Sequence, residues 1–94
     1  MTYARIDTNH TEIVKALREA GATVVSLASM KHGCPDLMVG YAGETLLMEI
    51  KKDKKAKFTP DQIDFMGKWK GGAISRVDSV EAALRTLGIM QKVL

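Results

Sequence analysis

Two acidic residues and a lysine stand where this chain could bind a metal ion. Asp36 closes the motif Gly33-Cys-Pro-Asp36, and Glu49 and Lys51 end the apolar run that starts at Leu46. A run this apolar is typical of a buried strand. An ionised carboxylate buried there lowers the stability of the fold by roughly several kcal/mol unless a partner stabilises it. Because a divalent cation is a common partner of carboxylates, the pattern predicts a cation site at Asp36 and Glu49.

The alternation of side chains along a strand sets the expected geometry of this site. Glu49 and Lys51 should project from the same face, roughly 6 to 7 Å apart. Asp36 can reach the same place from the neighbouring strand. The alternative is a plain salt bridge between Glu49 and Lys51, but two side chains that project in parallel should compete for the same solvent. We therefore expect a shared site for two acids and one ammonium group.

The elements that would position these residues follow from hydrophobic periodicity and from turn and capping residues. A hairpin is expected where Ala42-Gly43 joins two strands, and Thr59-Pro-Asp-Gln62 has the pattern of a helix start. The expected helices cover 11–20, 60–70 and 82–87, and the expected strands cover 24–27, 36–41, 45–51 and 73–77. The predicted order is α-β-β-β-α-β-α, an α/β fold with a mixed central sheet.

The composition fits one small intracellular domain spanning residues 1–94. The 94 residues carry a net charge of +3, and five lysines between Lys51 and Lys57 face a single acid, Asp53. Such a run suits phosphate binding, although a solvated flexible loop has the same composition. A single cysteine excludes an intrachain disulfide and favours the reducing cytoplasm. With no signal sequence or membrane span, we expect a cytoplasmic protein with no membrane partner.

The motifs together resemble a known group of nucleases. Pro35-Asp36, Glu49-Ile50-Lys51 and the Thr59-Pro-x-Gln helix resemble the PD-(D/E)xK superfamily, in particular the short stand-alone VRR-Nuc domains of phages and bacteria. The resemblance covers about residues 9–88. It implies a restriction-endonuclease-like core with a sheet flanked by helices and metal-dependent cleavage of DNA. It also implies a homodimer that acts on branched DNA such as Holliday junctions, in the host cytoplasm if the protein is phage-encoded.

The resemblance also implies a role for individual residues. Asp36, Glu49 and the backbone carbonyl of Ile50 would hold Mg²⁺, for which Mn²⁺ should substitute, and no organic cofactor is expected. Lys51 would position the attacking water. Glu12 would complete the metal site, or it would cap the first helix in a box with Asn9. Gln62 has the same two readings, as a site residue or as the capping partner of Thr59.

The sequence therefore predicts a Mg²⁺-dependent DNA endonuclease. DNA shape rather than base sequence should set its selectivity, because few residues are candidates for base reading. A non-catalytic DNA-binding or assembly subunit of the same fold is the alternative from another class, and a general nicking or restriction-type nuclease shares the same chemistry. Four residues are expected to hold the DNA backbone: Lys52, Lys54, Lys55 and Lys57.

Overall fold

Four strands form one mixed sheet in the computed structural model, which describes residues 8–89. The spatial order follows the chain: β1 (Thr23–Ser26), β2 (Leu37–Tyr41), β3 (Glu44–Ile50) and β4 (Ile74–Val77). β1 and β3 both run antiparallel to β2, and β4 runs parallel to β3. The predicted element order and the mixed sheet are confirmed. β3 lies between β2 and β4, so the motif that it carries is near the centre of the fold.

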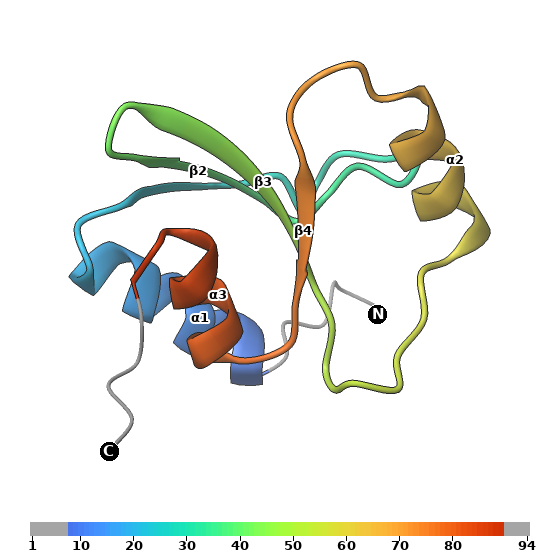
Figure 1. Ribbon diagram of the computed structural model, residues 1–94. Helices are drawn as coiled ribbons and strands as arrows, with labels where there is room; N and C mark the ends of the chain where they lie inside the picture. The colour runs from blue at the N-terminus through green and yellow to red at the C-terminus, as the bar shows by residue number, and fades with distance from the viewer. Residues whose placement is uncertain (1–7, 90–94) are drawn as a thin grey trace.

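Two helices cover one face of this sheet (Figure 1). They are α1 (Thr8–Glu19) and α3 (Val80–Thr86), which lie side by side under the strands. Ile13 and Leu17 of α1 are four residues apart and therefore share one helix face, and both are completely buried. The sheet contributes Leu37, Val39, Met48 and Val77 to the same core. These apolar contacts fix α1 and α3 against β2, β3 and β4.

The third helix, α2 (Pro60–Lys68), stands apart from this core (Figure 1). The Thr59 side chain accepts a hydrogen bond from the Gln62 amide, and Gln62 bonds back to the Thr59 amide, which confirms the predicted capping box. Trp69, with ψ of 126°, is extended and ends the helix before the predicted Lys70. None of the nine residues of α2 is fully buried. Its position therefore depends on other kinds of contact.

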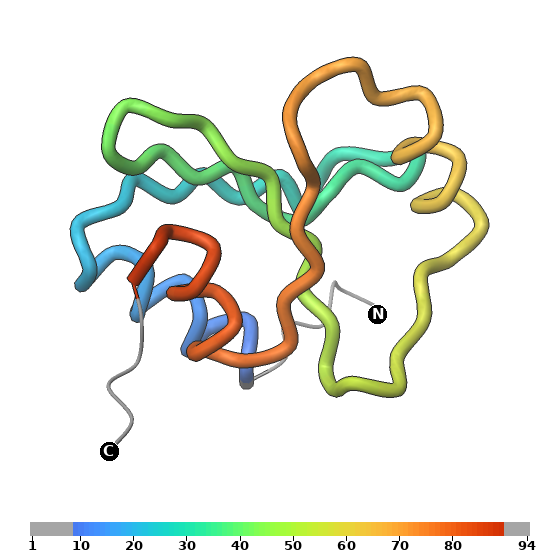
Figure 2. The backbone as a smooth tube through the Cα atoms, in the orientation of Figure 1, coloured from blue at the N-terminus to red at the C-terminus, as the bar shows by residue number. Residues whose placement is uncertain are grey.

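One of these contacts comes from the connection between β1 and β2, which extends as far as α2 (Figure 2). Gly33 in this connection has a φ of 80°. A Cβ atom at this position would overlap the main-chain carbonyl of Asp61. The close approach therefore requires glycine, and it sets the segment that leads into Asp36 against the first turn of α2.

The sheet face turned away from α1 and α3 is partly open. Val25 and Met38 are paired neighbours on this face and are 43% and 37% exposed. On or beside α2, Ile63 and Trp69 are 58% and 42% exposed, and the Trp69 indole donates a hydrogen bond to the Gly72 carbonyl at 2.7 Å. We call Val25, Met38, Ile63 and Trp69 the apolar surface. A fixed aromatic ring on an exposed surface is typical of an interface.

Most element bounds differ from the prediction by one to three residues, and the largest differences include two helix starts. α1 begins at Thr8 rather than Thr11, and α3 begins at Val80, where the Ser79 side chain caps it, rather than at Ala82. Of the apolar C-terminal run, Ile89 follows α3 outside any helix or strand, and residues 90–94 lie outside the described part of the chain. None of the helices described is long and apolar enough to cross a membrane.

Candidate active site

Asp36 and Glu49 face each other where β2 and β3 part. Leu37 and Met48 are the last paired residues of these strands, and the two acids are the next residue on each side. The Asp36 carboxylate accepts a hydrogen bond from the Ile50 amide at 2.8 Å, which replaces the missing strand partner. The structure therefore brings together the two acids of the predicted cation site.

The Glu49 carboxyl is buried and its acidity is strongly changed. The residue is 5% exposed, and its pKa is raised to about 7. Burial is the main cause, because it penalises the charged form, and the negative charge of Asp36 adds to it. The ammonium group of Lys51 opposes both effects. Burial and the same two carboxylates also raise the pKa of the Cys34 thiol, which makes Cys34 a poor nucleophile.

Gln62 connects Glu49 to Lys51. Its side-chain amide donates to Glu49 Oε2 at 2.7 Å, and its oxygen accepts from Lys51 Nζ at 2.8 Å. The same oxygen accepts from the Thr59 amide at 2.9 Å, so the capping role and the site role predicted for Gln62 occur together. Lys51 Nζ lies 3.7 Å from Glu49 Oε2, and the expectation that these two side chains would compete rather than pair is wrong. Both orient toward one point because Gln62 bridges them.

Lys51 is shielded as well as paired. Its side chain is 11% exposed, and Nζ lies 5.6 Å from the centre of the Phe58 ring. An ammonium group over an aromatic face is stabilised electrostatically, and more so where water is partly excluded. Lys51 is therefore held in one place beside the two acids.

The donor set fits a hard divalent cation. Glu49 Oε1 is buried and has no hydrogen-bond partner, so a carboxylate oxygen is left for another group. The Ile50 amide points to Asp36, and on an extended strand the carbonyl of the same residue points to the same side. Two carboxylates and one carbonyl are ligands that Mg²⁺ accepts, since it retains several waters. In the described part of the chain, no cluster of three or more His, Cys, Asp or Glu side chains occurs.

Glu12 does not join this site. Its side chain is exposed on α1, which covers the opposite face of the sheet from Glu49. The capping box predicted for Asn9 and Glu12 is also wrong, because α1 starts at Thr8 and the Asn9 side-chain oxygen has no partner. Asn9 instead donates to the Lys51 carbonyl at 2.8 Å. Its position four residues before Ile13, on the buried stripe of α1, is the sequence signal for this contact.

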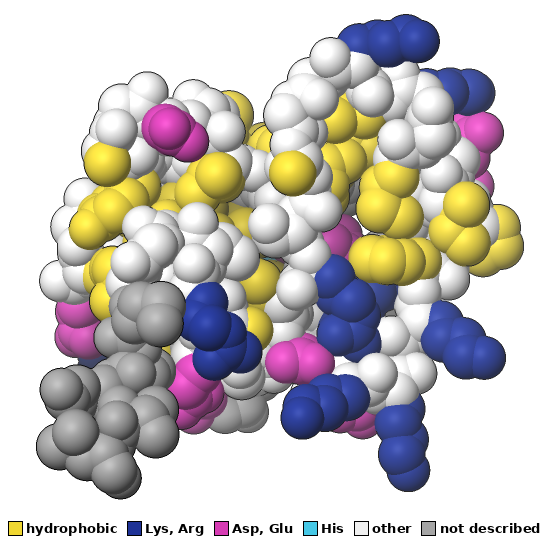
Figure 3. All heavy atoms as spheres, in the orientation of Figure 1, with side chains coloured by type: hydrophobic (Ala, Val, Ile, Leu, Met, Phe, Trp, Pro, Cys, Tyr) yellow, Lys and Arg dark blue, Asp and Glu magenta, His cyan; other side chains and the backbone are white. Residues whose placement is uncertain are grey.

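The five-lysine run separates into two parts. Lys51 points into the site, whereas Lys52, Lys54, Lys55 and Lys57 are exposed in the segment between β3 and α2. We call residues 52–57 the lysine loop. Figure 3 shows Lys and Arg side chains gathered along this part of the molecule, at the lower right. A concentration of positive charge therefore lies directly after the candidate catalytic strand.

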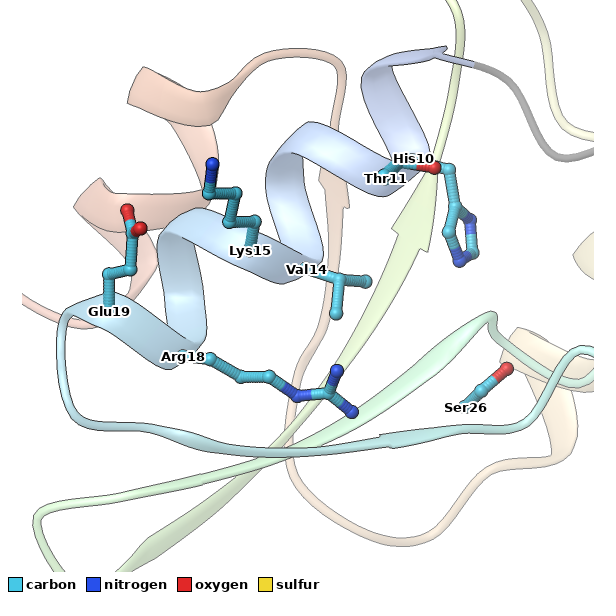
Figure 4. A pocket seen from close by; sticks show the side chains of 7 residues that line it. All are labelled: His10, Thr11, Val14, Lys15, Arg18, Glu19 and Ser26. Carbon is cyan, nitrogen blue, oxygen red and sulfur yellow. The ribbon is translucent and has the colours of Figure 1, made fainter.

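A groove of about 570 Å³ runs between α1 and the edge strand β1 (Figure 4). Arg18 extends along β1 and donates to the Val24 carbonyl at 3.1 Å, and Val14 lies between Arg18 and His10. His10 is next to Asn9, and Ser26 precedes Leu27, whose amide donates to the Asp36 carbonyl at 2.7 Å. One end of the groove therefore borders the strand ends that carry the site.

The sheet order and the Asp36, Glu49 and Lys51 arrangement define a PD-(D/E)xK nuclease-like protein. The family model described as archaeal Holliday junction resolvase (Hjc) matches residues 1–73, and the chain belongs to this family. The solved structure of a VRR_NUC domain matches with a TM-score of 0.63 and 25% identity, over 87% of this chain and 97% of that chain. No curated protein matches the chain. The predicted family and fold are confirmed.

Proposed function

We propose that this chain is a Mg²⁺-dependent DNA endonuclease that hydrolyses phosphodiester bonds in branched DNA, four-way junctions above all, and acts as a homodimer. Membership of a Holliday junction resolvase family suggests a structure-selective DNA nuclease. The observation that carries the proposal is the meeting of Asp36, Glu49 and Lys51 at one point, with Gln62 bridging the last two.

Asp36, Glu49 and the Ile50 carbonyl are the residues that would hold Mg²⁺, with Mn²⁺ as a substitute. The ion would polarise the scissile phosphate and lower the pKa of a water. Lys51 Nζ, held by Gln62 and the Phe58 ring, would orient the attacking water and stabilise the charge that develops on the phosphate oxygens. Gln62 would keep Lys51 and Glu49 at a fixed separation. We assign no catalytic role to Glu12, which is exposed on α1.

The lysine loop is proposed to bind the DNA backbone. Its four exposed lysines would neutralise phosphates and release counterions, which gives affinity without sequence preference. Selectivity for junctions would then come from the shape of the DNA and from the number of sites that reach it at once.

The homodimer is proposed on the apolar surface. Val25 and Met38 are exposed on the sheet face that α1 and α3 do not cover, Ile63 and Trp69 are exposed on or beside α2, and Met38 and Trp69 line one shared hollow. A two-fold axis through this surface would bury the same patch on each subunit and present two sites. Two sites suit a substrate that must be cut on two strands.

The test is cleavage of four labelled substrates by purified protein: linear duplex, single strand, flap and four-way junction, each with Mg²⁺, with Mn²⁺ and with chelator. We expect paired cuts in the junction with either metal and none with chelator. Asp36→Asn and Glu49→Gln should abolish cleavage but retain binding, because less negative charge faces the phosphates. Glu44→Gln, which removes an exposed carboxylate from the same strand, is the matched control and should cleave normally.

Other outcomes select the competing functions. Junction binding without cleavage under any metal condition would indicate a non-catalytic binding or assembly subunit. Equal cutting of duplex and junction would indicate a general nicking or restriction-type nuclease. Normal cleavage by Asp36→Asn or Glu49→Gln would contradict the catalytic assignment altogether.

A further inference from the structure

The lysine loop contains one acidic residue, Asp53, which forms hydrogen bonds within the loop. Asp53 Oδ1 accepts hydrogen bonds from the amides of Lys55 and Ala56, both at 2.9 Å. An Asp side chain that bonds to amides two and three residues ahead forms a local turn. The carboxylate of Asp53 is therefore directed into the loop backbone, and the exposed lysines on either side are left to face outward.

Arg76 of β4 also forms hydrogen bonds to this turn. One guanidinium nitrogen, Nη2, donates to the main-chain carbonyls of Asp53 and Ala56, both at 2.7 Å. These acceptors lie 23 and 20 residues away in the sequence. The turn thus has its amides bonded by Asp53 and its carbonyls bonded by Arg76. Among the described residues, no other side chain forms a hydrogen bond between the lysine loop and the sheet.

The charge of Arg76 is itself neutralised. Its second terminal nitrogen, Nη1, donates to Asp78 Oδ2 at 3.0 Å, and the two side chains are 27% and 16% exposed. An arginine with both terminal nitrogens engaged is poorly placed to bind a phosphate. Its planar fork can serve three acceptors at once, which the single nitrogen of a lysine cannot do in the same geometry.

We propose that Arg76 is a positioning residue that holds the lysine loop in its DNA-binding conformation before DNA arrives. The inference rests on the proposed function of that loop. A loop that is already ordered loses less conformational entropy when it binds, so preordering raises affinity without a new contact. Arg76 thereby acts on the substrate through Lys52, Lys54, Lys55 and Lys57.

A double-mutant cycle tests this directly. Four proteins are compared: wild type, Arg76→Met, a variant with all four loop lysines changed to Gln, and the combination of both. The probe is a labelled four-way junction in chelator, so that binding is measured without cleavage. Arg76→Met should weaken binding about tenfold in the wild-type background, a loss of about 1.4 kcal/mol. Arg76→Met should have no further effect in the variant that lacks the four loop lysines, because the groups through which Arg76 acts are gone.

Arg76→Lys keeps the charge but loses the fork, and it should weaken binding nearly as much as Arg76→Met. Arg85→Met, which removes an exposed positive charge from α3, should bind like wild type. Hydrogen exchange should show faster exchange of the Lys55 and Ala56 amides in both Arg76 variants, with unchanged exchange at Ile13 and Leu17. This second measurement separates loosening of the loop from loss of the fold.

Three results would overturn the inference. Arg76→Met could bind the junction as tightly as wild type, its penalty could persist in the lysine-free background, or loop exchange could remain unchanged. The second result would mean that Arg76 contacts DNA itself. If the variant with the four loop lysines changed to Gln bound like wild type, the proposed role of the loop would fail. Unchanged protection of the Lys55 and Ala56 amides in Arg76→Met would separately refute the proposal that Arg76 positions the loop.

Discussion

The raised pKa of Glu49 makes the stability of the metal-free protein depend on pH in an unusual direction. Its pKa rises from an ordinary value near 4.5 to about 7 on folding. Between these values the folded state binds more protons than the unfolded state, so the free energy of unfolding falls as the pH rises. The contribution of Glu49 is fully present below pH 4.5 and is lost as the pH passes 7. The difference between the two pKa values corresponds to about 3 kcal/mol.

Glu49→Gln isolates this effect, because Gln has the shape of the protonated acid and does not titrate. In chelator, the two proteins should be about equally stable at pH 4.5, and the variant should be more stable by about 3 kcal/mol at pH 8. Urea unfolding at several pH values, followed by the fluorescence of the chain's single tryptophan, Trp69, gives both free energies. A difference that stays constant from pH 4.5 to 8 would refute the reasoning. Addition of Mg²⁺ at pH 8 should stabilise wild type more than the variant.

Three further predictions each concern a single residue. Gly33→Ala should lower the free energy of unfolding by about 1 to 3 kcal/mol and reduce cleavage, because the residue has a positive φ and its new Cβ would push the β1–β2 connection away from Asp61. Gly43→Ala, also at positive φ but with open space around it, is the control in thermal unfolding and cleavage assays. Gln62→Ala should reduce cleavage about a hundredfold or more, because Lys51 and Glu49 lose their bridge; activity near wild type in single-turnover kinetics would remove Gln62 from the site. Met38→Glu should give a monomer by light scattering at micromolar concentration while Thr11→Glu on α1 stays dimeric; an equal mass for both would place the dimer contact elsewhere.

Much of the fold could be predicted because its signals are local. The β2–β3 hairpin turns at Ala42 and Gly43, both with positive φ, and these residues stand between two apolar runs. Once this hairpin is recognised, strand alternation places Asp36 beside Glu49 and Lys51. The capping box of Thr59 and Gln62 is likewise a pattern within four residues. For these features, sequence spacing and spatial distance give the same answer.

The contacts that could not be predicted join residues far apart in the sequence. Asn9 reaches Lys51 over 42 positions, and Arg76 reaches the lysine loop over 20 or more. Both depend on the packing of α1 and on the parallel register of β4, which no local pattern specifies. Glu12 could have been placed from the helix period, because Ile13 and Leu17 are the buried residues of α1 and Asn9, four positions before Ile13, lies on their face. Glu12 is exposed on α1 and lies outside this stripe.

The manner in which α2 is attached makes the assembly of the site a separate equilibrium. This helix has no fully buried residue, and polar bonds through Gln62 and the tight contact at Gly33 connect it to the rest of the chain. Units held in this way open with a free energy well below that of global unfolding. Each opening of α2 would carry Gln62 away from Glu49 and Lys51 and separate the proposed catalytic groups while the sheet stayed intact. The fraction of molecules able to cut DNA would then be set by the docking of one nine-residue helix rather than by the stability of the fold.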